Sequence, residues 1–291
     1  MMRAAQARGH SVFVCTQDAL HWVKNSVAAA ATRLSLTDND EDWYRNHETV
    51  ERPLREFDAV LMRKDPPFDL EYVVSTWLLS AAAREGARVF NAPDAIRDHN
   101  EKLAIAEFAP FVAPTLVSRE ASRLQAFIDE HRDVVVKRLD VMGGENIFRV
   151  RTDDPNRNVI IEIMSQGGTR TVMAQRFIPQ ITEGDKRVLL IDGKLVPHCL
   201  ARIPKPGESR GNLAAGARGE AQPVTARHRE IAGAVGPRLA ARGLLLVGLD
   251  VIGDWLTEVN VTSPTCFREI QDQTGFDVAG MFLDGLESRI Q

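Results

Sequence analysis

The chain has 291 residues, of which 44% are hydrophobic and 26% are charged. A chain of this length forms one large domain or two of ordinary size, and it can bury a substantial core. Its 36 Lys and Arg residues stand against 40 Asp and Glu residues, which gives a formal charge of −4 and a pI near 6.0. Because this balance leaves no basic excess for phosphate backbones, we expect no nucleic-acid partner.

The sequence contains no segment typical of membrane insertion or export. The apolar run 244–248 is followed by Asp250, long before the roughly 20 residues that a membrane helix needs. The first residues carry no apolar run of signal-peptide length. Cys15, Cys199 and Cys266 form no CxxC motif, so we expect reduced core thiols rather than a disulfide framework. These features predict a soluble, cytoplasmic protein without a membrane partner.

The first hundred residues alternate between short β-rich runs and helical patterns. Strands are predicted at 11–15, 58–62 and 87–90. A helix over 70–84 separates the last two, and this alternation predicts a parallel sheet covered by helices. The chain opens with a helix over 1–8 that Gly9 ends, so the strand expected before it is missing. Residues 37–56 are polar throughout and predict a surface connection with a short helix.

From residue 100 onward, short helices separate strands arranged as hairpins. The helices are predicted at 100–108, 122–131 and 225–242. The hairpins are predicted at 188–191 with 195–200 and at 245–252 with 256–261. Asp192-Gly193 and Gly253-Asp254 would form their turns. The sequence thus predicts an α/β domain over 1–99, with its first strand missing, and an antiparallel α+β domain over 100–291.

The clearest chemical signal lies on the last hairpin, where Asp250, Glu258 and Asn260 interrupt an apolar pattern. Residues 258 and 260 share a face, because side-chain direction alternates along a strand. A three-residue turn would place Asp250 opposite Glu258, whereas a two-residue turn would put them on opposite faces. In the first register, two carboxylates and an amide carbonyl suit Mg²⁺ or Mn²⁺ shared with phosphates. The alternative is a solvated outer face, and we favour the metal site.

A lysine inside a β run forms the second motif. Lys137 lies in the run 134–139, and Gly143 and Gly144 follow in a turn. A buried lysine needs an anion, and backbone N–H groups of such a turn can contact phosphate oxygens. The motif therefore suggests nucleotide binding. The alternative is a lysine that snorkels at an edge strand.

Two loops carry further candidate residues. Arg63 begins a loop with two prolines that follows a predicted strand, and a turn without chemistry is its equal alternative. Arg210 and Arg218 lie in the glycine-rich segment 209–219, which can open and close at low steric cost and bring arginines to a transferring phosphoryl group. A mobile surface loop is the alternative there. Its glycines have Walker A spacing without the required Lys and Ser or Thr.

With these residues in view, the chain resembles the bacterial glutathione synthetases of the ATP-grasp superfamily over nearly its whole length. The resemblance rests on six strings in order: LMRKDPPFD (61–69), NEKL (100–103), GDKRV (184–188), LARIP (200–204), RGNLAAG (210–216) and TEVNVTSPT (257–265). It implies a substrate-binding α/β domain followed by an ATP-grasp domain that holds ATP between two antiparallel sheets.

The resemblance also implies roles for individual residues. The nucleotide would be held by Lys102, Lys137, Gly143, Gly144, Gln175, Arg176, Phe177, Ile178, Asp185 and Arg187. Within that set, the lysines and Arg187 would contact phosphates, 175–178 the adenine, and Asp185 the ribose. The implied metal ligands are Asp250, Glu258 and Asn260. The implied catalytic arginines are Arg202 and Arg210, and the implied substrate contacts are Arg63, Asp65, Ser263, Pro264 and Thr265.

The implied reaction is the ATP-dependent ligation of γ-glutamylcysteine with glycine through an acyl phosphate, giving glutathione, ADP and phosphate. Mg²⁺ or Mn²⁺ would be the cofactor, and the family analogy suggests a homotetramer. Val141 and Ala217 stand where the family's two loops have glycine, so we expect reduced loop mobility rather than lost chemistry. The alternatives are another ATP-grasp carboxylate–amine ligase and a catalytically silent nucleotide-binding remnant.

Overall fold

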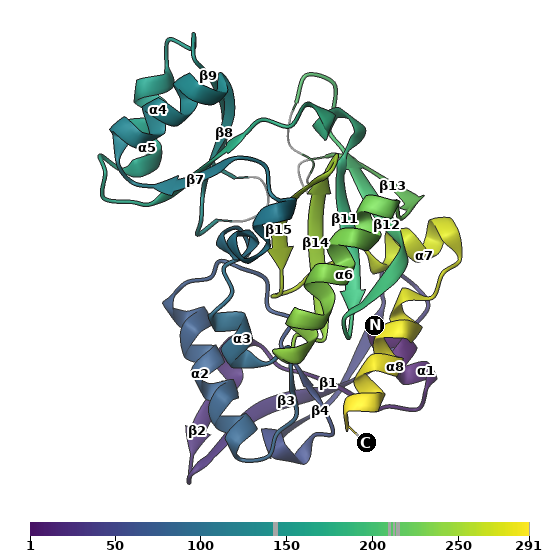
Figure 1. The fold of residues 1–291 in the computed structure, drawn as a ribbon. Helices are drawn as coiled ribbons and strands as arrows, with labels where there is room; N and C mark the ends of the chain where they lie inside the picture. Colours follow the sequence, from purple (N-terminus) through teal and green to yellow (C-terminus); the bar gives the residue numbers. More distant parts are fainter. Residues whose placement is uncertain (142–144, 209–210, 212, 214–215, 291) are drawn as a thin grey trace.

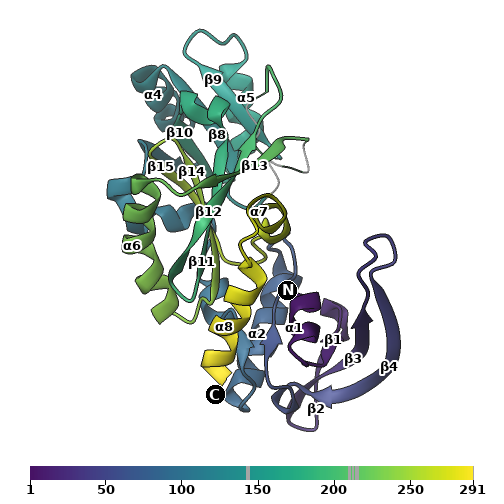
Figure 2. The ribbon, with the colours of Figure 1, turned by 90° about the vertical axis from the view of Figure 1, so that its right-hand side faces the viewer.

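The structure is a computed structural model that describes residues 1–141, 145–208, 211, 213 and 216–290 (Figure 1). The N-terminal part contains a four-stranded antiparallel sheet made of β1 (Val12–Val14), β2 (Leu20–Val23), β3 (Ser26–Leu36) and β4 (Tyr44–Pro53). β1 and β2 pair with different parts of β3, and β4 pairs along the other edge of β3. In Figure 2, the β3–β4 hairpin projects to the right, and Asp40 at its end pairs with Arg3 and Arg268.

The prediction for residues 37–56 is therefore wrong in its main point. β4 occupies 44–53, and the helix is only the short 3₁₀ turn η2 (Leu54–Glu56). Most side chains of β4 are exposed on both faces of the strand. A strand that buries neither face shows no alternation of apolar and polar residues, which explains why its sequence resembles a surface connection.

Helices and a short parallel pair complete the N-terminal part. Its remaining elements are α1 (Met2–Ala7), η1 (Gln17–Ala19), β5 (Val60–Leu61), α2 (Leu70–Arg84), β6 (Val89–Phe90) and α3 (Pro93–Arg97). The predicted parallel pairing is confirmed for β5 and β6. α2 begins where predicted because the Asp69 carboxylate accepts a hydrogen bond from the Tyr72 backbone N–H at 2.9 Å. α2 contacts β2 and β3.

A smaller antiparallel sheet follows the 3₁₀ helix η3 (Leu103–Phe111). Its order is β7-β10-β8-β9, with β7 (Thr115–Ser118), β8 (Asp133–Arg138), β9 (Ile147–Arg151) and β10 (Val172–Arg176). α4 (Ala121–His131) and α5 (Arg157–Ser165) cover one face, and a core of its own lies between them and the sheet. In Figure 1 this unit stands apart at the upper left.

A five-stranded antiparallel sheet forms the centre of the molecule. Its order is β13-β12-β11-β14-β15, with β11 (Asp185–Ile191), β12 (Lys194–Ile203), β13 (Arg218–Pro223), β14 (Leu246–Ile252) and β15 (Trp255–Asn260). The short helix η4 (Pro179–Glu183) leads into β11. Both predicted hairpins are confirmed, and Asp192 and Gly193 adopt the positive φ angles, 51° and 73°, of a two-residue turn.

Helices cover both faces of this sheet. α6 (Ala226–Ala241) packs on one face, and α7 (Phe267–Thr274) and α8 (Val278–Ile290) pack on the other (Figure 1). Val188 and Leu190 belong to the core on the α6 side, whereas Leu189 and Ile191 belong to the core on the α8 side. Burial on both faces explains why residues 188–191 are apolar without interruption.

Two further predictions bear on the compartment. Within the part of the chain that the structure describes, none of the helices combines the length and apolarity that a membrane crossing requires. Cys15, Cys199 and Cys266 are free thiols. Cys199 and Cys266 are buried, but Cys15 is exposed at the end of β1, so the prediction of a core thiol is wrong for Cys15.

Candidate active site

The β14–β15 hairpin presents the three predicted oxygen donors on one face. Its turn has two residues, Gly253 and Asp254, because Ile252 pairs with Trp255. A β-bulge then shifts the register, and the Thr257 hydroxyl donates a hydrogen bond to the Asp250 carbonyl at 3.1 Å. The extra residue restores the pairing of Asp250 with Glu258, which a two-residue turn alone would have prevented.

Asp250 is bound by two buried arginines from neighbouring strands. Arg187 Nε donates to Oδ1 at 2.6 Å, and Arg187 Nη2 reaches Oδ2 at 3.1 Å. Arg202 Nη2 lies 2.9 Å from the same Oδ2. Burial alone would raise the pKa of Asp250, but the two guanidinium groups hold it well below its usual range. Asp250 is therefore ionised at neutral pH.

Glu258 lies between two buried lysines. Its Oε1 is 3.7 Å from Lys102 Nζ and 3.7 Å from Lys137 Nζ, distances longer than a hydrogen bond. Burial lowers the pKa of Lys137 against the opposing effect of Glu258. Burial acts in the same direction on Lys102, but Glu258 and Glu101 outweigh it and raise the Lys102 pKa. Glu258 of the β14–β15 hairpin thus faces Lys137.

Two more carboxylates complete what we call the charge cluster. Asp185 Oδ2 accepts from Arg202 Nη2 at 2.6 Å, and burial raises the pKa of Asp185 to about 7. Glu101 Oε1 accepts from Lys102 Nζ at 2.5 Å. The charge cluster is defined by Glu101, Lys102, Lys137, Asp185, Arg187, Arg202, Asp250 and Glu258. With every group ionised, its four basic and four acidic side chains carry no net charge.

The donor set suits a divalent cation. In the described part of the chain, no group of three or more His, Cys, Asp or Glu side chains forms a metal cage. The candidate ligands on the hairpin are instead two carboxylates and one amide, which share a face by the register of β14 and β15. Hard oxygens of this kind, with further positions left to phosphates, are typical of Mg²⁺ sites.

The predicted substrate residues come together from both ends of the chain. Arg63 Nη2 donates to the Pro264 carbonyl at 2.7 Å, and the Ser263 hydroxyl donates to Asp65 Oδ1. Gly248 connects this junction to the charge cluster, because a Cβ there would lie 2.9 Å from Arg187 Cδ and 2.9 Å from Pro264 Cβ. Only glycine allows β14 to pass this close to both.

Family models match both parts of the chain. Residues 1–97 match the family model "Prokaryotic glutathione synthetase, N-terminal domain", and residues 101–275 match "Prokaryotic glutathione synthetase, ATP-grasp domain". The chain belongs to the prokaryotic glutathione synthetase family. Glutathione synthetase of Ralstonia nicotianae is 61% identical over 99% of this chain and 89% of that protein. Glutathione synthetase of Pseudomonas aeruginosa is 51% identical over 100% of this chain and 92% of that protein.

Solved structures with low sequence identity share the fold of this glutathione synthetase family member. D-cycloserine synthetase DcsG is 16% identical, with a TM-score of 0.65 over 82% of this chain and 86% of that chain. The ATP-grasp ligase PsnB is 19% identical, with a TM-score of 0.63 over 99% of this chain and 93% of that chain. These likenesses support the ATP-grasp fold alone.

The segment that the family resemblance assigns to adenine, Gln175 to Ile178, ends β10 and leads toward the central sheet. Gln175 and Ile178 are buried, and the Gln175 amide donates to the Thr115 hydroxyl at 3.0 Å. The Phe177 backbone N–H donates to the Asp133 carbonyl at 2.9 Å. The Arg176 guanidinium lies over the Trp255 ring, 5.6 Å from its centroid, and so joins the β7-β10-β8-β9 sheet to the β14–β15 hairpin.

The remaining residues predicted for a glutathione synthetase site are not joined to the charge cluster by the contacts described above. Gly143, Gly144 and Arg210 are outside the described residues. Thr265 is exposed next to the buried Cys266. Sequence reasoning assigned no role to Glu101 and Thr257, although both belong to strings that carry the family resemblance. Their role could be recognised only from contacts, because neither interrupts a pattern as Asp250 does.

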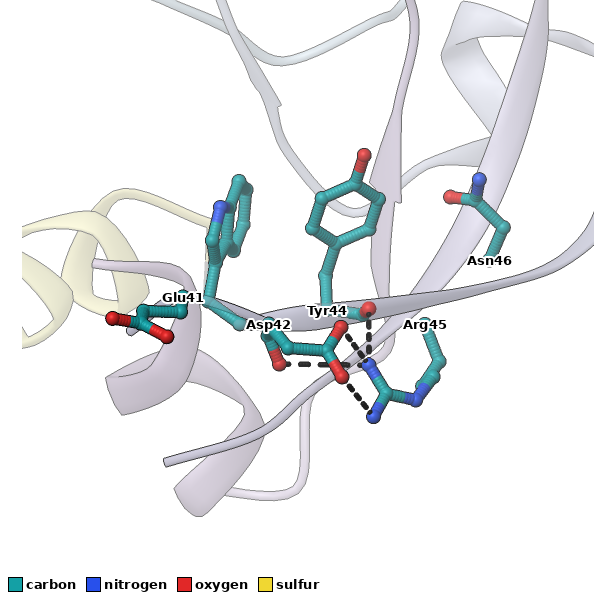
Figure 3. Close-up of a pocket in the computed structure, with 6 residues that line it drawn as sticks. Glu41, Asp42, Tyr44, Arg45 and Asn46 are labelled. Carbon is teal, nitrogen blue, oxygen red and sulfur yellow. Dashed lines mark hydrogen bonds and ion pairs between the residues drawn. The ribbon is translucent and has the colours of Figure 1, made fainter. Parts of the chain in front are cut away.

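A surface hollow lies at the end of the β3–β4 hairpin (Figure 3). Residues 41–46 line it, and Arg45 holds Asp42 by an ion pair. All of its lining residues come from one hairpin end, and none belongs to the charge cluster.

Proposed function

We propose that the charge cluster is where this chain activates γ-glutamylcysteine with ATP before joining it to glycine. As a glutathione synthetase family member, the chain is an ATP-dependent ligase that synthesises glutathione. The proposal rests on one observation above all: Glu258 lies between two buried lysines and directly opposite Asp250. Buried lysines beside hard-oxygen donors are suited to a nucleotide triphosphate bound with a divalent cation.

The chemistry explains why such a site is needed. A carboxylate is a poor electrophile, so ATP must first convert the cysteine carboxylate of γ-glutamylcysteine to an acyl phosphate. In this step the carboxylate oxygen forms a bond to the γ-phosphorus and ADP leaves. The glycine amine then attacks the carbonyl carbon and loses a proton, and phosphate departs with the oxygen that had bonded to phosphorus, while the other oxygen remains as the amide carbonyl. Lys102, Lys137 and Arg202 would stabilise the charge on the transferring phosphoryl group by position and electrostatics.

The metal would be held by Asp250, Glu258 and Asn260. When bound, a divalent cation neutralises phosphate charge and orients the β- and γ-phosphates. We propose Mg²⁺, with Mn²⁺ as a substitute, because oxygen-only donor sets suit both ions. Arg187 would keep Asp250 in place as it does here, and Asp185 would lie near the ribose while fixing Arg202.

Further segments would bind the peptide and exclude water. Arg63, Asp65 and residues 263–265 would bind γ-glutamylcysteine, and Gly143, Gly144 and Arg210 would cover the phosphates. Exclusion of water protects the acyl phosphate until the amine attacks. Residues 175–178 would hold the adenine.

We also propose the domain organisation, compartment and partners of the enzyme. Residues 1–99 would form the substrate-binding domain and 100–291 the ATP-grasp domain. Three free cysteines fit a reducing compartment, so we place the chain in the cytoplasm. Its partners would be ATP, γ-glutamylcysteine, glycine and further copies of itself in a homotetramer, with no nucleic acid or membrane among them.

A coupled assay tests the proposal. With ATP, Mg²⁺, γ-glutamylcysteine and glycine, we expect equal amounts of ADP, phosphate and glutathione. Replacing glycine with alanine or glutamate should lower ADP release strongly. Comparable release with these amines would overturn the glycine assignment. Thermal stabilisation by Mg-ATP without any phosphate release that depends on γ-glutamylcysteine would overturn the catalytic proposal.

A further inference from the structure

The Lys102 ammonium donates two hydrogen bonds to protein oxygens, to Glu101 Oε1 at 2.5 Å and to the Val141 carbonyl at 2.6 Å. A second carboxylate, Glu258, lies 3.7 Å away, beyond hydrogen-bond distance. The side chain of Lys102 is only 3% exposed. A nucleotide phosphate that contacts Lys102 would therefore share the ammonium with Glu101, the carboxylate that is hydrogen-bonded to it.

Glu101 accepts hydrogen bonds from the β14–β15 hairpin as well as from Lys102. Its backbone carbonyl accepts a hydrogen bond at 2.8 Å from the N–H of Val259, the residue between Glu258 and Asn260. Asn100 fixes the same turn from the other side, since its Oδ1 accepts from the Lys102 backbone N–H at 3.1 Å. Glu101 thus has a fixed backbone, and its carboxylate is the anion closest to Lys102 Nζ.

We infer that Glu101 is a positioning residue that holds the Lys102 ammonium in place and occupies the position of a phosphate oxygen until the nucleotide arrives. This inference rests on the proposed function, in which Lys102 contacts ATP. Its physical basis is the balance of the charge cluster. Without Glu101, the cluster keeps four basic and three acidic groups, so its net charge becomes positive, and the Lys102 ammonium loses its strongest anionic competitor for phosphate.

Glu101→Gln should bind Mg-ATP more tightly and yet turn over more slowly. A merely structural lesion next to Lys102 would weaken nucleotide binding. Removal of a competing charge should instead tighten it, by on the order of threefold to tenfold in Kd for Mg-ATP. At the same time kcat should fall, because the neutral amide holds the ammonium less firmly than a charge-assisted bond does.

The experiment measures Kd for Mg-ATP by calorimetry, without γ-glutamylcysteine, and kcat in the coupled assay. Glu101→Asp keeps the charge and should bind Mg-ATP within about twofold of the original chain. Glu107→Gln is the matched control, because Glu107 lies in η3 as an exposed partner of Arg242 and should change neither value. Thermal unfolding of each variant shows whether it is folded.

Two variants distinguish a failure of the positioning role of Glu101 from a failure of the proposed function. Lys102→Met should weaken Mg-ATP binding tenfold or more, and unchanged binding in that variant would remove Lys102 from the nucleotide site and overturn the proposed function. If Lys102→Met weakens binding but Glu101→Gln binds Mg-ATP no more tightly than Glu107→Gln, only the positioning role of Glu101 fails. Tighter binding in Glu101→Gln and not in Glu101→Asp supports it.

Discussion

The charge cluster and the substrate junction of Arg63, Asp65, Ser263 and Pro264 lie side by side but are built on different physical terms. In the cluster, buried ions from five strands and the start of η3 compensate one another. In the junction, one guanidinium donates to a backbone carbonyl and one hydroxyl donates to a carboxylate. Loss of a cluster residue leaves another charge buried and unpaired, whereas loss of a junction residue removes a single contact. We therefore expect the cluster to couple activity to stability and the junction to affect substrate binding alone.

The largest expected effect comes from Asp250→Asn. This change leaves two buried guanidinium groups without their shared carboxylate, so it should lower the free energy of unfolding by about 3–5 kcal/mol and abolish turnover. Urea unfolding measures the loss. Asp254→Asn is the control, because Asp254 is exposed in the turn of the same hairpin. Equal stability of the two variants would show that the arginine pair does not depend on Asp250.

Glu258→Gln removes a cluster carboxylate that lies beyond hydrogen-bond distance of both of its lysine partners. Because this carboxylate lies 3.7 Å from each lysine, the free energy of unfolding should fall by less than it does in Asp250→Asn. Turnover should still fall by on the order of 10²- to 10³-fold, because a charged metal ligand is lost. Steady-state assays at saturating Mg²⁺ check this, with the exposed Glu230→Gln as control. Normal turnover would remove the hairpin from the mechanism.

Arg63→Ala tests the junction. Loss of its hydrogen bond to the Pro264 carbonyl should raise KM for γ-glutamylcysteine by roughly tenfold and leave KM for ATP within about twofold. The control is Arg55→Ala, which removes a half-exposed arginine that pairs with Glu85. An equal rise in both KM values would contradict the separation between junction and cluster.

The smallest effect is a change in pH dependence through Asp185. Burial raises its pKa to about 7 in the folded chain, above the ordinary value of 3.8, so its contribution to stability is full below pH 4 and is lost as the pH rises through 7. Asp185→Asn removes this loss. The free energy of unfolding of the variant, relative to the original chain, should therefore increase between pH 4 and 7 and then level off. A constant difference across this range would contradict the assignment.

Only part of the charge cluster and its hairpin could be predicted from the sequence. Asp250, Glu258 and Asn260 could be recognised because oxygen-bearing residues interrupted an apolar strand pattern. Their register could not be deduced, since the bulge at Thr257 depends on a side-chain hydrogen bond that no spacing reveals. The pairing of Arg187 with Asp250 was equally invisible, because it joins residues 63 positions apart.

Secondary structure could be predicted only where burial imposes a pattern on the side chains. Residues 70–84 and both central hairpins were predicted because burial imposes a period on their side chains. The β3–β4 hairpin was missed for the opposite reason. β4 buries almost nothing, and Ala28 to Ala31 in β3 are small residues without strong strand preference, so long-range pairing rather than local sequence makes this sheet.

Anomalous scattering from crystals grown with Mn²⁺ and a non-hydrolysable ATP analogue tests the central claim most directly. The account predicts a manganese peak about 2.0–2.3 Å from oxygen atoms of Asp250, Glu258 and Asn260, with Lys102 and Lys137 at the phosphates. A nucleotide bound with its metal away from the β14–β15 hairpin, or with neither lysine in contact with a phosphate, would contradict it.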